Sequence, residues 1–148
     1  MPRQPAPTGA LAMPAREFGI VLTLVFTGGG LGTLARAGID RLWPAHGWPW
    51  ATFGINLLGT AVLAWLLTYL ADRGPETRWG LRVKLGAGTG LLGGFTTYSA
   101  FGVQIAERID TSPWLAGGYA LASLAGGLAA ALVVSRWTRS VVTRRSEP

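Results

Sequence analysis

Four long apolar runs constrain this chain more than any other feature of its sequence. They cover residues 18–39, 50–71, 85–106 and 113–135, and Arg36 is the only charged residue inside them. A helix rises ~1.5 Å per residue and needs about 20 residues to cross the hydrocarbon core of a bilayer. The runs lack the strict polar–apolar alternation of membrane barrel strands. We therefore expect an all-α, multi-pass membrane protein with four transmembrane helices at these positions.

The composition agrees with a lipid environment and excludes several classes of site. Charged residues make up only 14% of the chain, and the mean hydropathy is +0.35. Cysteine is absent, which excludes disulfides and thiolate metal sites, and the single His46 lies in a predicted loop. The basic residues flank the apolar runs instead of forming one polar face. The expected partner is therefore the lipid bilayer and not a nucleic acid.

The same reading divides the chain into three parts. Residues 1–16 are predicted to form a disordered, proline-rich tail, because their apolar stretch at 10–13 is too short for a signal peptide. Residues 17–137 are predicted to form the four-helix transmembrane domain. Residues 138–148 are predicted to form a basic C-terminal tail.

The basic residues predict an orientation in the membrane. With four spans, the N-terminal tail, the middle loop and the C-terminal tail share one side, which carries Arg3, Arg16, Arg73, Arg78, Arg82, Lys84, Arg136, Arg139, Arg144 and Arg145. The other side carries only Arg36, Arg41 and Arg108. Because loops rich in Lys and Arg remain cytoplasmic, we expect both termini in the cytoplasm and the chain in an inner membrane.

The residues that the spans lack narrow the possible functions. No Asp, Glu, His or Lys lies inside the four runs. A proton-coupled multidrug exporter of similar size needs a membrane-embedded ionisable group, and a hydrolytic enzyme needs a general base. We therefore expect no enzyme. A small non-channel membrane scaffold remains an alternative, and a small multidrug exporter is the weaker one.

The third run has the most unusual sequence. Gly86, Gly90 and Gly94 recur every four residues and form a smooth stripe against which another helix could pack closely. Gly93-Gly94 is followed by Thr96-Thr97, so poor helix formers meet β-branched residues in the middle of the span. One interpretation is a helix broken near its middle, with freed backbone groups that could coordinate an ion. The other is an unbroken glycine-lined packing helix.

Polar side chains in the other spans also allow two interpretations. Asn56 lies in the second span, and as a buried amide it is either interhelical glue or a donor that faces a pore. Tyr119 and Ser123 lie one turn apart in the fourth span. Arg36 either extends to the membrane interface or serves as a vestibule residue or tertiary anchor.

Three segments carry a resemblance to a known family. Residues 28–36 fit Gly-Gly-x-x-Gly-x-x-x-Arg, and residues 52–59 fit Thr-x-x-x-Asn-x-x-Gly. Residues 93–101 are similar to Gly-Gly-x-Thr-Thr-Phe-Ser-Thr-Phe, with Tyr98 in place of Phe and Ala100 in place of Thr. In this order, over about residues 26–135, they resemble the CrcB/Fluc family of fluoride channels.

The resemblance implies a channel subunit that passively exports fluoride from the cytoplasm. It implies an antiparallel dimer with two narrow pores and a central sodium ion held by the backbone carbonyls of Gly93 and Thr96. The implied pore residues are Asn56, Thr97, Tyr98, Ser99, Phe101, Tyr119 and Ser123, with Arg36 in the vestibule. Tyr98 and Phe101 would present their ring edges, which carry the positive part of the aromatic quadrupole, to the anion.

The sequence allows two kinds of partner subunit. A subunit that inserts equally in both orientations should have little charge bias, whereas this one has ten basic residues on one side and three on the other. The sequence is therefore compatible with a homodimer or with a heterodimer that includes an oppositely oriented paralogue.

Overall fold

The computed structural model describes residues 13–43 and 47–145, and this part of the chain is helical and has no strands. The elements are α1 (Ala15–Leu42), α2 (Trp50–Ala71), α3 (Arg78–Val83), the π-helix η1 (Lys84–Leu92), α4 (Gly93–Phe95), α5 (Tyr98–Ile109) and α6 (Pro113–Arg145). The all-α prediction is confirmed. Most of the predicted N-terminal tail, residues 1–12, lies outside the described residues, and α1 begins at Ala15, inside the predicted tail.

Helices long and apolar enough to cross a membrane are found at Ala15–Leu42, Trp50–Ala71 and Pro113–Val142 within the described residues. The predicted second span coincides with α2, whereas α1 and α6 extend beyond the predicted ends. The predicted third span is not one helix. It consists of η1, α4 and α5, and its role as a fourth membrane crossing stays a prediction.

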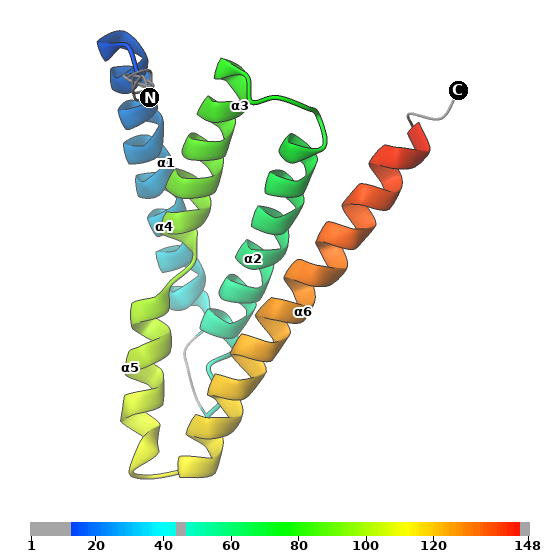
Figure 1. Cartoon of the computed structure of the whole chain (residues 1–148). Coiled ribbons are helices and arrows are strands. Elements are labelled where there is room, and N and C mark those ends of the chain that lie inside the picture. Colours follow the sequence, from blue (N-terminus) through cyan, green and yellow to red (C-terminus); the bar gives the residue numbers. More distant parts are fainter. Residues whose placement is uncertain (1–12, 44–46, 146–148) are drawn as a thin grey trace, which may run out of the picture.

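The elements run between two ends of the molecule (Figure 1). The start of α1, the α2–α3 connection and the end of α6 lie at one end, and the α5–α6 turn lies at the other. Helix α1 packs along η1 and α4, α2 packs along α6, and α5 packs against the first part of α6. The interrupted segment therefore lies between α1 on one side and the α2–α6 pair on the other.

Glycines allow the backbones of α1 and η1 to touch. A Cβ placed on Gly28 would lie 2.6 Å from the Gly86 carbonyl oxygen, and one on Gly90 would lie 2.9 Å from the Val25 carbonyl oxygen. A Cβ on Gly94 would overlap the backbone of Gly29. The predicted packing stripe of the third run is thus confirmed, with α1 as its partner.

The first half of the interrupted segment is wider than an α-helix. In η1 the hydrogen bonds span five residues, and the Gly93 N–H continues this pattern by donating to the Gly88 carbonyl. Such π-helical stretches are rare, and the sequence pattern predicts an ordinary helix here. Glycines 86, 88 and 90 of this stretch face the neighbouring helices, because a Cβ at these positions would meet Leu24 and Val25 of α1 or Leu63 and Leu66 of α2.

An ion pair ties the first turn of α1 to α3. The Arg82 Nε and Nη2 groups donate to the two Glu17 carboxylate oxygens, each at 2.7 Å. Glu17 is buried at this contact. Two hydrogen bonds in parallel fix the start of α1 beside the segment that leads into η1.

Candidate functional site

The helix break predicted for residues 93–97 lies at Thr96 and Thr97. Both threonines are extended, with φ and ψ of −77° and 159° at Thr96 and −146° and 120° at Thr97. The Thr97 hydroxyl then caps α5 by accepting a hydrogen bond from the Ala100 N–H at 3.1 Å. Gly93 and Gly94, which were expected to be unwound, remain helical in α4. Helix α4 therefore ends at the extended Thr96, and not at the glycine pair, and α5 begins after the capping Thr97.

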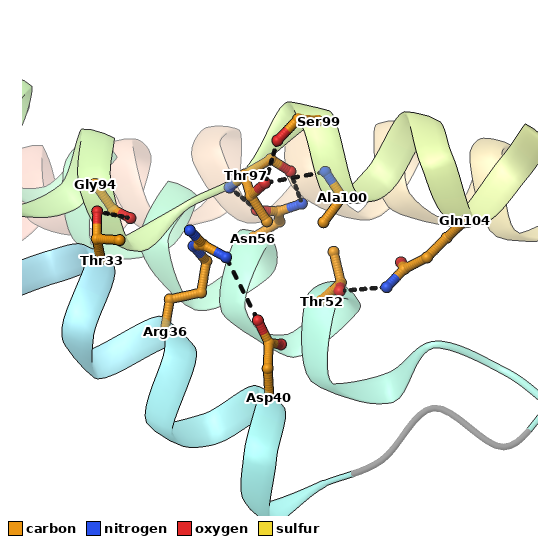
Figure 2. A network of polar contacts seen from close by, with 10 residues as sticks. All are labelled: Thr33, Arg36, Asp40, Thr52, Asn56, Gly94, Thr97, Ser99, Ala100 and Gln104. Atoms are coloured by element: carbon orange, nitrogen blue, oxygen red, sulfur yellow. Dashed lines mark hydrogen bonds and ion pairs between the residues drawn. The ribbon is translucent and has the colours of Figure 1, made fainter.

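Asn56 pairs with the backbone at this break (Figure 2). Its Nδ2 donates to the Thr97 carbonyl at 3.0 Å, and its Oδ1 accepts from the Thr97 N–H at 2.8 Å. The side-chain amide therefore replaces a neighbouring peptide group. The interhelical-glue interpretation describes these two bonds well, and Nδ2 retains a second N–H that could face an ion.

The break also releases two carbonyl groups from their helical partners. The Thr97 N–H would bond the Gly93 carbonyl in a continued helix, but it donates to Asn56. The Ala100 N–H would bond the Thr96 carbonyl, but it donates to the Thr97 hydroxyl. Gly93 and Thr96 thus present backbone oxygens that suit a hard cation.

A groove of about 630 Å³ lies between α2, the interrupted segment and α6. Its lining includes most of the predicted site residues, namely Asn56, Gly93, Thr96, Thr97, Tyr98, Phe101 and Ser123. Thr60 and Thr89 add hydroxyl groups, and Lys84 is the only residue with a full charge in the lining. Residues from three distant parts of the sequence therefore line one groove, whose lining apart from Lys84 is neutral and mostly apolar.

The two aromatic residues of the motif differ in their surroundings. Tyr98 is 84% exposed, whereas Phe101 is buried. Their ring centroids lie 5.8 Å apart, and the Phe101 ring lies 5.4 Å from that of Tyr119. Phe101 is thus held between two rings while Tyr98 projects from the chain.

The predicted hydroxyl residues lie in different places. The Ser123 Oγ is buried in the groove and has no hydrogen-bond partner among the described residues. The Ser99 hydroxyl is 3.2 Å from that of Thr97. Tyr119 does not line the groove, because it is fully buried and its hydroxyl donates to Gln104. It supports Phe101 from behind.

Sequence reasoning missed Gln104, which joins three elements. The Tyr119 hydroxyl donates to Gln104 Oε1 at 2.9 Å, and Gln104 Nε2 donates to the Thr52 hydroxyl at 2.8 Å. Thr52 is buried on the same face of α2 as Asn56. The sequence does contain a signal for this role. Gln104 is a single amide side chain in an apolar run, three residues after Phe101, and a buried amide must find hydrogen-bond partners.

Arg36 extends from α1 toward the break (Figure 2). Its Nη1 lies 3.5 Å from an oxygen of Asp40, and its Nε is buried without a partner in the described part of the chain. The role of Arg36 as a vestibule residue or tertiary anchor stays a prediction.

Comparison with known families agrees with the motif positions. The family profile described as CrcB-like protein, Camphor Resistance (CrcB) matches residues 23–135. The chain belongs to the CrcB family. The match to the family profile covers every residue of the break, of the groove and of the Gln104 network.

Curated relatives of this CrcB-family chain carry a functional name. A protein of Cutibacterium acnes named fluoride-specific ion channel FluC 1 is 48% identical over 130 residues, which cover 86% of this chain and 91% of the relative. Fluoride-specific ion channel FluC 2 of Leifsonia xyli subsp. xyli is 47% identical, with 82% and 85% covered. The FluC 1 protein of Mycobacterium tuberculosis is 39% identical, with 84% and 94% covered.

Proposed function

We propose that this chain is a subunit of a fluoride channel that lets fluoride leave the bacterial cytoplasm passively. The observation that carries the proposal is the groove, which brings neutral donors of a CrcB-family chain to one surface. The relatives named as fluoride-specific ion channels support the choice of ion. The proposed location is the inner membrane, with a multi-pass topology, and the long apolar helices support it.

The lining suits a small, strongly hydrated anion. A pore must replace the water around fluoride with donors, yet must not bind the ion too firmly to release it. Asn56 and Ser123 supply N–H and O–H donors, and Phe101 supplies a positive ring edge. The single full charge, Lys84, stands at the start of η1, away from the break. The other residues that line the groove are neutral, so the lining holds no further fixed charge that would trap the ion.

A second subunit would complete the site. Tyr98 belongs to the groove lining and is nevertheless 84% exposed within a single chain. We propose that an antiparallel partner, either a second copy or an oppositely oriented paralogue, covers this ring and closes the groove into a pore. Four membrane crossings with a broken third span complete the proposed topology.

A sodium ion is the proposed structural cofactor of this dimer. The carbonyl oxygens of Gly93 and Thr96 fit it, because the break frees them from helical hydrogen bonds. The ion would supply positive charge that holds two breaks together. Asn56 would keep Thr97 extended so that these oxygens stay available.

Efflux from liposomes tests the proposal. The purified protein, either alone or together with an oppositely oriented paralogue, is reconstituted in vesicles loaded with potassium fluoride or potassium chloride. Anion release is measured after a potassium ionophore is added. We expect release of fluoride and retention of chloride, with the faster release from the paired preparation. A scaffold would retain both ions, and either retention of fluoride by both preparations or equal release of the two ions would contradict the proposal.

A further inference from the structure

A second cavity of about 520 Å³ lies where α2 turns into α3. Gly74 has a φ of +96°, a conformation that glycine adopts easily, and it turns the chain back over the end of α2. The cavity shares Leu67 and Lys84 with the groove but otherwise has its own walls. The proposed ion path does not account for it.

The lining of this cavity combines apolar and cationic side chains. Leu67 and Leu70 line it from α2, and Arg73 and Lys84 also belong to the lining. Lys84 lies at the start of η1. Helix α2 is apolar until it ends at Ala71, so Arg73 lies just beyond the apolar length of that helix. This is the depth at which phospholipid headgroups lie.

Aromatic side chains mark the same depth. The Trp79 side chain lines the cavity and is 60% exposed, as is common for tryptophans at the membrane interface. The Arg73 guanidinium lies 4.5 Å from the centroid of the Tyr69 ring and donates to its hydroxyl. This contact holds Arg73 in place while other N–H groups of its guanidinium stay available to an acceptor.

One carboxylate competes for these cations. The Glu76 carboxylate lies 3.1 Å from Lys84 Nζ, and both side chains are about half exposed. Two cations against one carboxylate leave the lining with a net positive charge. A phosphate group could bind Arg73 directly and could replace Glu76 at Lys84.

We propose that this cavity binds the headgroup phosphate of an anionic phospholipid, whose acyl chains lie along Leu67 and Leu70. The apolar wall distinguishes a lipid from a free phosphate ion. The charge pattern of the sequence agrees, because the α2–α3 connection belongs to the side with ten basic residues, which faces the leaflet rich in anionic lipid. The site does not depend on ion conduction.

Lipid binding to the purified protein in detergent tests the proposal. Native mass spectrometry would measure retention of phosphatidylglycerol and of phosphatidylcholine, with inorganic phosphate as a soluble competitor. We expect phosphatidylglycerol to bind about tenfold more tightly than phosphatidylcholine, and inorganic phosphate to displace neither. Equal affinity for the two lipids, or displacement by inorganic phosphate at the lipid concentration, would overturn the proposal.

Variants locate the site. Arg73→Gln and Lys84→Gln should each weaken phosphatidylglycerol binding by about fivefold, the effect expected for one basic residue near an anionic headgroup. Arg41→Gln is the matched control, because it removes an exposed cation at the far end of α1 and should leave binding unchanged. Parent-like binding by Arg73→Gln, or an equal loss in Arg41→Gln, would overturn the assignment.

A third variant acts in the opposite direction and leaves both cations in place. Glu76→Gln removes the carboxylate that holds Lys84, so it should strengthen phosphatidylglycerol binding by about twofold or more. This gain would not arise from general damage to the fold. A weaker affinity in Glu76→Gln would contradict the proposed competition at Lys84.

Discussion

The Asn56 side chain makes two hydrogen bonds to the backbone of Thr97, in the way that the backbone of an adjacent β-strand would pair with an extended residue. One amide therefore serves two purposes, because it satisfies the backbone at the break and lines the groove. A buried peptide group left without a partner costs about 1–3 kcal/mol, so the break depends on this side chain. Substitutions at Asn56 must therefore separate its structural role at the break from its role in fluoride conduction.

Comparison of Asn56→Asp with Asn56→Ala makes this separation. Asp retains the acceptor for the Thr97 N–H, whereas Ala loses both bonds, so Asp should fold at least as well as Ala. Asp also adds a negative charge beside the anion path, so its fluoride flux should be lower than that of Ala and at least about tenfold below the parent. Liposome efflux and thermal unfolding measure the two effects. Near-normal fluoride flux in Asn56→Asp would contradict a conducting role for Asn56 and leave it only its structural role.

Phe101 tests whether a ring edge contributes to conduction. Phe101→Ile approximately keeps the volume but removes the quadrupole, so fluoride efflux should fall by about tenfold. Phe53→Ile is the matched control, because Phe53 packs against Trp48 and Trp50 and does not line the groove. If both variants conduct like the parent, Phe101 only fills space between Tyr98 and Tyr119.

At the scale of elements, the contact between α1 and the interrupted segment places the break. Backbone meets backbone along this contact, and Thr33 of α1 donates to the Gly94 carbonyl at 3.4 Å, one turn before the break. Close packing leaves no room for even a methyl group at several positions. The glycines therefore set the depth at which Thr96 and Thr97 lie.

Gly32→Ala should destabilise the protein, whereas Gly30→Ala should not. A Cβ on Gly32 would overlap the Leu91 carbonyl oxygen and lie 2.7 Å from the Phe95 nitrogen, while one on Gly30 meets nothing within 4 Å. Forcing a methyl group into a packed contact costs roughly 1–3 kcal/mol. Thermal unfolding in detergent would measure the difference. Equal midpoints for the two variants would contradict the close packing of α1 on η1.

At the scale of the whole molecule, the position of the termini decides how subunits can pair. Both ends of the described chain lie at the same end of the bundle as the α2–α3 connection (Figure 1). The basic residues are concentrated on this same side, which favours one orientation in the membrane. An antiparallel dimer needs both orientations.

We predict that most copies insert with both termini in the cytoplasm. The chain expressed alone should then confer weak fluoride resistance, and an oppositely biased paralogue should raise it. Paired cytoplasmic and periplasmic reporters on the C-terminus would measure the orientation, and growth in fluoride would measure the resistance. Comparable signals from both reporters, together with full resistance from this gene alone, would show a self-sufficient homodimer.

The sequence by itself determined the helical class, the extent of α2 and the region of the break. These features follow from local properties, namely the length of apolar runs, the four-residue spacing of glycines and the low helix propensity of a Gly-Gly-x-Thr-Thr segment. Most of the site residues predicted from the motifs and their neighbours also line the groove.

Only the tertiary structure decided which groups meet. The break falls at Thr96 and Thr97 because Asn56, 41 residues before Thr97, supplies the missing backbone partner. Tyr119 leaves the predicted polar track because its hydroxyl donates a hydrogen bond to Gln104 Oε1. Periodicity along one helix gives the face on which a polar group lies, but its hydrogen-bond partner depends on how the helices pack against one another.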